Sequence, residues 1–180
     1  MTESAPKASA SKTRLGYIGL GNMGAPMAQR LLDWPGGLVV CDARAEALEP
    51  FTAAGASAAS TPADVAAQAS IISVTVLDDA QVREVVCGLH GILSTAQPGT
   101  VVAIHSTISD TTAVELADIC QQRGVLLVDA PISGGAGGAA QGRLAVMIGG
   151  SDEAFGAVRE PSDPGPSWWF TPVTSARERE

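Results

Sequence analysis

A glycine-rich loop between an apolar run and an amphipathic segment constrains this chain more than any other feature. The apolar run of residues 14–20 leads into Gly-Leu-Gly-Asn-Met-Gly at positions 19–24, and apolar side chains then recur at helical spacing up to Asp33. A GxGxxG in this place predicts a turn that binds a dinucleotide when an acid follows about 20 residues later. Asp42 stands at that distance, at the end of the next apolar run.

The rest of the chain continues this alternation of short apolar runs and amphipathic segments. Because parallel strands need crossover connections, usually helices, the order predicts an α/β fold with a doubly wound parallel sheet, a Rossmann-like NAD(P)-binding domain. Ligands of such sheets bind at the carboxyl ends of the strands. Besides the run before the glycine loop, strands are expected at 38–41, 71–77, 101–104 and 125–129, and helices at 22–33, 45–54, 62–68, 80–87 and 110–122.

The expected domain covers residues 14–160, between a disordered tail of residues 1–13 and a C-terminal tail of residues 161–180. A net charge of -8 argues against nonspecific nucleic-acid binding, and no apolar run approaches the roughly 20 residues of a membrane helix.

The three cysteines form no zinc pattern, so we expect no metal site and reduced, mostly buried thiols. Since the first residues also lack the apolar stretch of a secretory signal, a cytoplasmic location is expected.

Asp42 and Arg44 bear on the choice of cofactor. A carboxylate after the second strand accepts hydrogen bonds from the adenosine ribose hydroxyls and repels a 2′-phosphate, so Asp42 favours NAD over NADP. Arg44 is either a solvated residue at the start of a helix, which is the favoured interpretation, or a cation for a 2′-phosphate. The expected cofactor is therefore NAD or NADP, with NAD favoured by Asp42.

A second glycine-rich segment follows the strand expected at 125–129 and reads Asp-Ala-Pro-Ile-Ser-Gly-Gly at positions 129–135. Unobstructed main-chain N–H groups and the Ser133 hydroxyl suit a substrate carboxylate, and the residues alone support a flexible turn equally well. His105 follows the strand expected at 101–104. Its imidazole is of the type that titrates near neutrality, but we interpret it as a hydrogen-bonded residue at a strand end, without a catalytic role.

Three motifs in this order resemble those of the β-hydroxyacid dehydrogenases, which include 3-hydroxyisobutyrate dehydrogenase, tartronate semialdehyde reductase and the NADP-binding domain of 6-phosphogluconate dehydrogenase. The motifs are residues 18–24 with Met27, Ser106 with Thr107, and residues 129–135 with Gly142 and 147–150. The resemblance implies an NAD(P)-dependent oxidoreductase that transfers hydride between a small 3-hydroxy acid and nicotinamide.

The resemblance also implies the roles of individual residues. Asp42 would bind the adenosine ribose, with Leu77 and Asp78 in its neighbourhood, and Thr107 would lie on the nicotinamide side. Asp78 departs from the family, because many members have proline after the leucine. The implied cofactor-binding residues are Gly19, Leu20, Gly21, Asn22, Met23, Gly24, Asp42, Leu77, Asp78 and Thr107, and the implied substrate-binding residues are Ser133, Gly134 and Gly135.

The family's general acid/base is a lysine in a later motif, GxxGxGxxxKxxxN, which this sequence lacks. Its lysines are Lys7 and Lys12, both in the N-terminal tail, and arginine does not deprotonate in proteins. The helical C-terminal domain, which forms much of the family's homo-oligomer interface, has no counterpart either. In a shifted reading frame the codons from Trp168 onward permit Val-Val and then a glycine pattern like the missing motif. We therefore expect a truncated chain, with a frameshift between the codons of about Pro161 and Trp168.

The sequence alone is compatible with three functions. The first is an NAD(P)-dependent dehydrogenase of small 3-hydroxy acids. The second is a catalytically inactive dinucleotide-binding module or gene remnant, since no catalytic residue can be assigned. The third, a methyltransferase that binds S-adenosylmethionine, ranks low because it does not explain residues 129–135.

Overall fold

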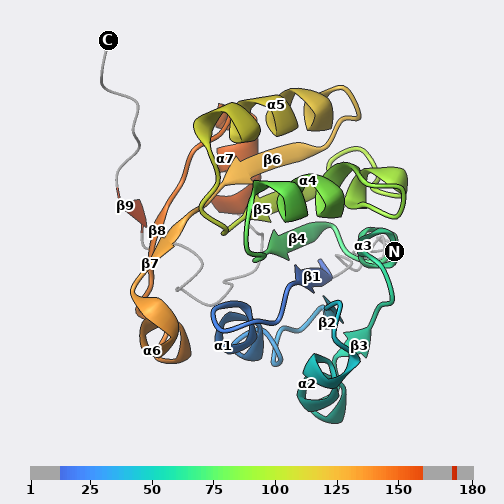
Figure 1. Ribbon diagram of the computed structural model, residues 1–180, viewed down its shortest axis with the longest axis vertical. Coiled ribbons are helices and arrows are strands. Elements are labelled where there is room, and N and C mark those ends of the chain that lie inside the picture. The colour runs from blue at the N-terminus through green and yellow to red at the C-terminus, as the bar shows by residue number, and fades with distance from the viewer. Residues whose placement is uncertain (1–12, 160–171, 174–180) are drawn as a thin grey trace, which may run out of the picture.

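A six-stranded parallel sheet forms the centre of the computed structural model, which describes residues 13–159 and 172–173 (Figure 1). The strand order β3-β2-β1-β4-β5-β6 reverses direction between β1 and β4, as in a doubly wound sheet. The expected Rossmann-like fold is thus confirmed. The strands are β1 Leu15–Ile18, β2 Leu38–Cys41, β3 Ser57–Ala58, β4 Ile71–Val74, β5 Val101–Ile104 and β6 Leu126–Asp129.

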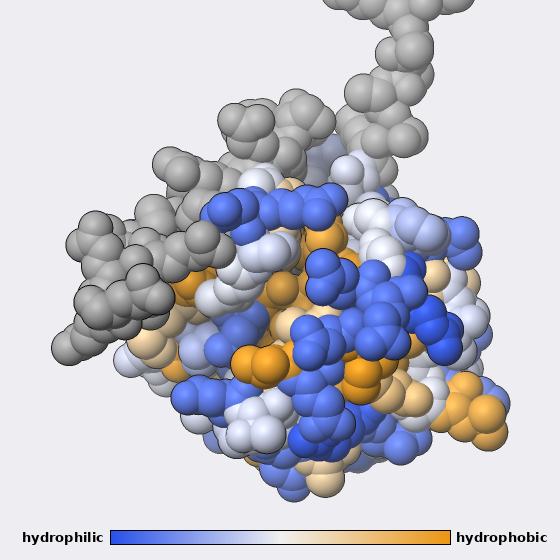
Figure 2. Space-filling view, turned by 90° about the horizontal axis from the view of Figure 1, so that it is seen from above, coloured by the Kyte–Doolittle hydropathy of each residue, from blue (hydrophilic) through white to orange (hydrophobic). Residues whose placement is uncertain are grey.

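Helices cover both faces of this sheet. Three of them, α3, α4 and α5, begin at a side chain that caps the first turn: Thr61, Asp78 and Ser109 each accept a hydrogen bond from a main-chain N–H three residues later. The face of the molecule in Figure 2 is mostly hydrophilic, with small apolar patches between polar side chains. The helices are α1 Gly24–Gln29, α2 Glu49–Ala53, α3 Pro62–Ala66, α4 Asp79–Cys87, α5 Asp110–Gln121, α6 Gly135–Ala140 and α7 Asp152–Arg159, with short 3₁₀ turns η1 Ala45–Ala47 and η2 Ile92–Ser94.

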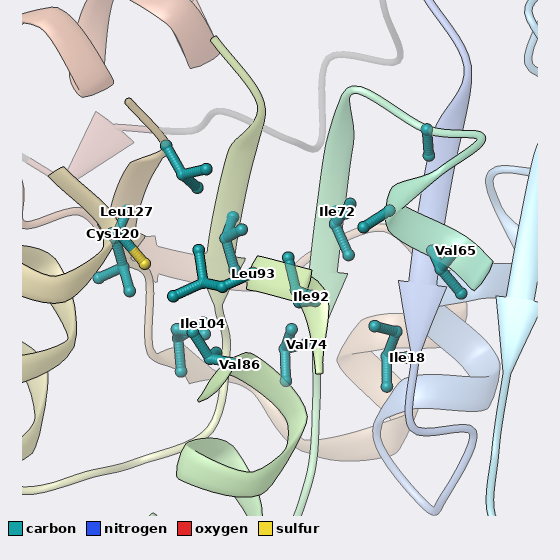
Figure 3. Packing of buried hydrophobic residues seen from close by; sticks show 14 of the residues in the cluster. Ile18, Val65, Ile72, Val74, Val86, Ile92, Leu93, Ile104, Cys120 and Leu127 are labelled. Atoms are coloured by element: carbon teal, nitrogen blue, oxygen red, sulfur yellow. The ribbon is translucent and has the colours of Figure 1, made fainter. Parts of the chain in front are cut away.

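The core follows from the alternation of side chains along the strands. In β1, Ile18 packs on one face of the sheet, whereas Leu15 and Tyr17 pack on the other. Figure 3 shows the first of these faces, where Ile72 and Ile104 from the sheet lie among apolar side chains of α4, η2 and α5. Both faces of the central strands are therefore buried, which is why these strands read as continuous apolar runs in the sequence.

A second, three-stranded sheet was not expected from the sequence. It has the order β7-β8-β9, with β7 Ile132–Ser133, β8 Ala145–Met147 and β9 Pro172–Val173. Main-chain hydrogen bonds between Asp129 and Gly149 attach this sheet to the end of β6. The segment after β6 therefore forms a strand, a helix and a strand.

Several expected boundaries also differ from the structure. The helix expected at 22–33 ends at Gln29. The main-chain N–H groups of Arg30, Leu31 and Leu32 donate to the carbonyl three residues earlier, whereas an α-helix requires the carbonyl four residues earlier. The strand β3 and the turn η2 were not expected. Residues 1–12 and most of the expected tail at 161–180, including Trp168, lie outside the described residues.

The three cysteines are free thiols, and two of them meet the expectation of burial. Cys41 and Cys120 are buried, and burial raises the pKa of Cys41 to about 11 and that of Cys120 to about 12. Cys87 is the exposed exception: it follows Val86, which is buried against the sheet, and a helix turns its next side chain about 100° away. In the part of the chain that the structure describes, no helix is both long enough and apolar enough to cross a bilayer.

Candidate functional site

The glycine loop between β1 and α1 has two closed positions and one open position. Gly19 has φ +93°, and a Cβ built there would lie 2.0 Å from the carbonyl oxygen of Thr75. A Cβ at Gly24 would lie 1.8 Å from the carbonyl oxygen of Gly19, so the start of α1 packs directly on the loop. Gly21 is exposed, and a Cβ there would meet no atom within 4 Å. The loop thus has the tight turn, the close helix and the open backbone that a pyrophosphate site requires.

The side chains within the loop differ in their surroundings. Asn22 is exposed next to the open glycine, whereas Met23 packs partly against the apolar cluster around α1. Leu20 is buried, and its main-chain N–H faces the end of β2. The structure therefore places Leu20 and Met23 as supports of the loop, and leaves Asn22 beside Gly21 at its surface.

Asp42, the residue after β2, holds the loop through its carboxylate. Its Oδ2 accepts a hydrogen bond from the Leu20 N–H at 2.6 Å, and its Oδ1 accepts from the main-chain N–H of Arg44 at 2.9 Å and from its Nε at 3.1 Å. Partial burial raises the pKa of Asp42, but these hydrogen bonds lower it by more, so its pKa lies below the ordinary value. Arg44 also donates to the Leu20 carbonyl at 3.3 Å. Its side chain is 56% exposed at the start of η1, as expected for a solvated residue at the start of a helix, and it is also paired with Asp42.

The loops after β4 and β5 lie next to each other at the same end of the sheet. Leu77 is 86% exposed, an unusual position for a leucine, and its N–H donates to the side-chain oxygen of Gln81. Asp78 accepts from the Gln81 N–H at 2.8 Å and so caps α4. Thr107 is exposed in the loop after β5. This part of the site therefore offers one apolar side chain, one hydroxyl and a carboxylate already used as a helix cap.

Ser133, Gly134 and Gly135 form the junction of β7 and α6. All three are exposed, and the two glycines have φ values of +133° and +64°, which only glycine adopts readily. In Figure 1 this junction lies on the side toward which the arrows of β4 and β6 point. The structure therefore places the expected substrate segment at the carboxyl ends of the parallel strands, where the glycine loop also lies.

His105 lies behind the site, in the core. It is buried after β5, where its Nδ1 lies 3.0 Å from the Ala130 carbonyl and its Nε2 lies 3.1 Å from the Ser73 hydroxyl. Since a carbonyl only accepts, Nδ1 carries the proton and donates it, and Nε2 accepts from Ser73. Burial lowers the pKa of His105 to about 4, so the ring is neutral at physiological pH. The expected hydrogen-bonded residue at a strand end is confirmed.

Two side chains that sequence analysis did not assign connect the loops of the site. The Ser106 hydroxyl lies 2.8 Å from both the N–H and the carbonyl oxygen of Val76, so it joins the ends of β4 and β5. Asp79 at the start of α4 accepts hydrogen bonds from Ser109 at the start of α5. Both helix starts were visible in the sequence, but the contact between them spans 30 residues and depends on the order of the strands.

Known proteins are similar to this chain in sequence. Residues 14–161 match the family described as the NAD binding domain of 6-phosphogluconate dehydrogenase. An uncharacterized oxidoreductase of Mycobacterium tuberculosis is 62% identical over 148 residues, which are 82% of this chain and 50% of that protein. The mitochondrial 3-hydroxyisobutyrate dehydrogenase of Rattus norvegicus is 40% identical over 151 residues, which are 84% of this chain and 45% of that protein. The chain thus spans about half the length of the curated relatives it matches.

Solved structures agree with the sequence comparison. The 3-hydroxyisobutyrate dehydrogenase of Mycobacterium tuberculosis with L-serine superposes with a TM-score of 0.75 at 33% identity, over 82% of this chain and 50% of that chain. Psf3 in complex with NADP+ and 2-OPP superposes with a TM-score of 0.76 at 29% identity, over 81% of this chain and 51% of that chain.

Proposed function

Because this chain belongs to the family of the NAD binding domain of 6-phosphogluconate dehydrogenase, we propose that it binds NAD or NADP across the carboxyl ends of its strands. The observation that carries the proposal is the glycine loop, which is closed at Gly19 and Gly24 and open at Gly21. Its open main chain would receive the pyrophosphate. The cofactor would supply hydride transfer, and the protein would hold and orient it. The other proposed cofactor-binding residues are Leu20, Asn22, Met23, Asp42, Leu77, Asp78 and Thr107.

NAD is the favoured cofactor. The hydrogen bonds of Asp42 keep its carboxylate ionised, and an ionised carboxylate after β2 accepts ribose hydroxyls and repels a 2′-phosphate. For NADP to bind, Arg44 would have to leave Asp42 and pair with the phosphate instead. That Psf3 forms a complex with NADP+ shows why the alternative is kept.

A small 3-hydroxy acid is the proposed substrate class, with Ser133, Gly134 and Gly135 at its carboxylate. The relatives named above include 3-hydroxyisobutyrate dehydrogenases, one of them with L-serine, which is itself a small hydroxy acid. The exposed Ser133 hydroxyl and the main-chain N–H groups of two glycines suit such a carboxylate. This junction follows β6 directly, so the carboxylate would lie near the nicotinamide side of the cofactor.

The 180-residue chain is proposed to bind the cofactor without turning over a substrate. Hydride transfer from an alcohol needs a base for the hydroxyl proton, and the sequence places no lysine after Lys12. His105 does not replace it, because both ring nitrogens face hydrogen-bond partners within the core. The proposed activity of this chain by itself is therefore dinucleotide binding.

Titration of the purified 180-residue chain with NADH, followed by the fluorescence of the bound nicotinamide, tests this proposal. Saturable binding that NAD and ADP reverse is expected, and S-adenosylmethionine is expected not to compete. NADPH is expected to bind more weakly than NADH. Absence of saturation with both reduced cofactors at millimolar concentration would refute the function, whereas displacement by S-adenosylmethionine alone would favour a methyltransferase.

A further inference from the structure

The carboxylate of Asp79 joins the starts of two helices that border the proposed cofactor site. Asp79 is the first residue of α4, and its Oδ2 accepts hydrogen bonds from the Ser109 N–H at 3.1 Å and from the Ser109 hydroxyl at 2.7 Å. The same oxygen accepts from the hydroxyl of Thr112 at 2.5 Å. These hydrogen bonds from Thr112 and Ser109 lower the pKa of Asp79 to about 2, so the carboxylate is ionised at every pH at which such a protein is normally studied.

These contacts fix the loop that carries Thr107. On one side of Thr107, the Ser106 hydroxyl bonds the main chain of Val76; on the other side, Ser109 is held by Asp79. Thr107 is thus exposed between two anchored residues that are three positions apart. Val76 lies in the segment between β4 and α4, and Asp79 is the first residue of α4, so the loop after β5 takes its position from that segment and from the start of the helix.

The segment between β4 and α4 is held independently of the Asp79 carboxylate. The Leu77 N–H donates to the side chain of Gln81 at 3.1 Å, and the Gln81 N–H donates to Asp78 at 2.8 Å. Loss of the Asp79 carboxylate would leave these two contacts in place. Its effect would therefore fall on the Thr107 loop, and spare both Leu77 and the glycine loop.

We propose that Asp79 is a positioning residue that holds the Thr107 loop in place for the nicotinamide half of the dinucleotide, an inference that rests on the proposed cofactor binding. Asp79 itself touches no cofactor in this role. It acts through Ser109 and Thr112, and it pre-arranges the loop so that binding does not have to order it.

A purely structural role would consist of tying α4 to α5. The ion pair between Arg83 and Glu115 does this a turn further along the same helices, with a nitrogen–oxygen distance of 2.5 Å. Both of these side chains are partly exposed, and Arg83 also donates to the Thr112 hydroxyl at 3.0 Å, but neither side chain bonds Ser106, Thr107 or Ser109. Glu115→Gln is therefore a matched control, since it removes a carboxylate between the same two helices and leaves the loop anchored.

The experiment compares NADH with ADP as ligands of the full 180-residue chain. ADP contains the adenosine and the pyrophosphate but lacks the nicotinamide, so it reports on the glycine loop and Asp42 alone. For Asp79→Ala we expect about tenfold weaker NADH binding and ADP binding within about twofold of the unsubstituted chain. Asp79→Asn should lose less, because its amide oxygen still accepts a hydrogen bond. The fluorescence of bound NADH should change in both variants and stay unchanged in Glu115→Gln.

Other outcomes overturn the inference. NADH affinity and fluorescence unchanged in Asp79→Ala would show that the loop needs no such anchor. Equal losses for NADH and ADP, or an equal loss in Glu115→Gln, would show a structural role only. Should Asp79→Ala not fold, the near-isosteric Asp79→Asn carries the same comparison. If the unsubstituted chain binds neither NADH nor ADP, both the proposed function and this inference are refuted. If the unsubstituted chain binds NADH and the Asp79 variants bind it equally well, the inference alone is refuted.

Discussion

At the scale of single residues, Gly21 and Gly24 are needed by the same loop for different physical reasons. Alanine at Gly24 would place a Cβ 1.8 Å from the Gly19 carbonyl oxygen, so the backbone has to move, whereas alanine at Gly21 meets no atom within 4 Å. We expect Gly24→Ala to lower the free energy of unfolding by about 1–3 kcal/mol, as overpacking does. Gly21→Ala should keep its melting temperature but lose NADH binding, because its methyl group occupies the place of the pyrophosphate.

Thermal melts and NADH titrations of both variants check this contrast. Gly21→Ala is the decisive variant, because it should lose NADH binding and keep the melting temperature of the unsubstituted chain. If it binds NADH as tightly as the unsubstituted chain does, the pyrophosphate does not lie over the glycine loop.

Asp42 and Arg44 should shift cofactor preference in opposite directions. Asp42→Asn keeps an oxygen that can accept from the Leu20 N–H and removes the negative charge next to the ribose, so we expect the ratio of NADPH to NADH affinity to rise about tenfold. Arg44→Gln removes the cation available to a 2′-phosphate and should lower that ratio. Parallel titrations with the two cofactors measure it. A ratio that is the same in both variants would place the 2′ position of the ribose away from this pair.

His105 should make the stability of the chain depend on pH in the acid range. Burial lowers its pKa to about 4, against an ordinary value of 6.5, so between these values the unfolded chain binds a proton that the folded chain does not. The contribution of neutral His105 to the free energy of unfolding is therefore fully present above pH 6.5, and it is lost as the pH drops toward 4. From linkage we expect a loss of about 2 kcal/mol between pH 8 and pH 5.

Urea unfolding at these two pH values measures the effect. His105→Gln should be less stable at pH 8, because it disturbs the bonds to Ser73 and Ala130, but should lose about 2 kcal/mol less on acidification. His90 is exposed, and His90→Gln is measured alongside as a histidine substitution outside the core. An equal acid loss in His105→Gln would assign the effect to other groups.

At the scale of elements, the sequence was informative wherever burial or a cap left a local signal. The strands Leu38–Cys41 and Val101–Ile104 have the expected bounds, since each is an apolar run buried on both faces. β3, with two residues, and α6, built from glycine and alanine, carry neither an apolar pattern nor a capping side chain. These elements form because their neighbours hold them: β3 pairs with β2, and α6 packs against α1.

The helix α6 should consequently respond to substitutions that change only its backbone preference. A Cβ at Gly137 meets no atom within 4 Å, so Gly137→Ala should raise the free energy of unfolding by about 0.5–1 kcal/mol. Gly135 also has open space but a φ of +64°, and Gly135→Ala should lower it, because alanine is strained there. Urea unfolding of the two variants compares one and the same change of side chain at two backbone conformations. A destabilised Gly137→Ala would mean that α6 is not helical in solution.

At the scale of the whole molecule, the candidate site is assembled from loops that lie far apart in the sequence. The motif at residues 19–24 and the segment around Ser133 were identifiable because their glycines carry a local signal. The contacts of Asp79 with Ser109 and of Ser106 with Val76 were not, because they exist only once β4 and β5 lie side by side. Sequence patterns thus indicated which residues are candidates for contact with a ligand, and the sheet order determined which residues hold the loops that carry them.

The same view of the whole chain separates cofactor binding from catalysis. The glycine loop, Asp42 and the Thr107 loop all follow strands of the six-stranded sheet, within residues 13–159. A base for the hydroxyl proton is a different requirement, and no lysine follows Lys12. We therefore expect the 180-residue chain to bind NADH saturably and to reduce NAD with 3-hydroxyisobutyrate about 10²–10⁴ times more slowly than the rat 3-hydroxyisobutyrate dehydrogenase does.

The absorbance of NADH, followed at saturating NAD, measures this rate, and the rat 3-hydroxyisobutyrate dehydrogenase serves as the positive control. Weak cofactor binding alone would slow the reaction only until NAD saturates the site, whereas a missing base slows it at every NAD concentration. The residual rate at saturation therefore distinguishes the two causes. A saturated rate within tenfold of the rat enzyme would show that a group other than lysine accepts the hydroxyl proton in this chain.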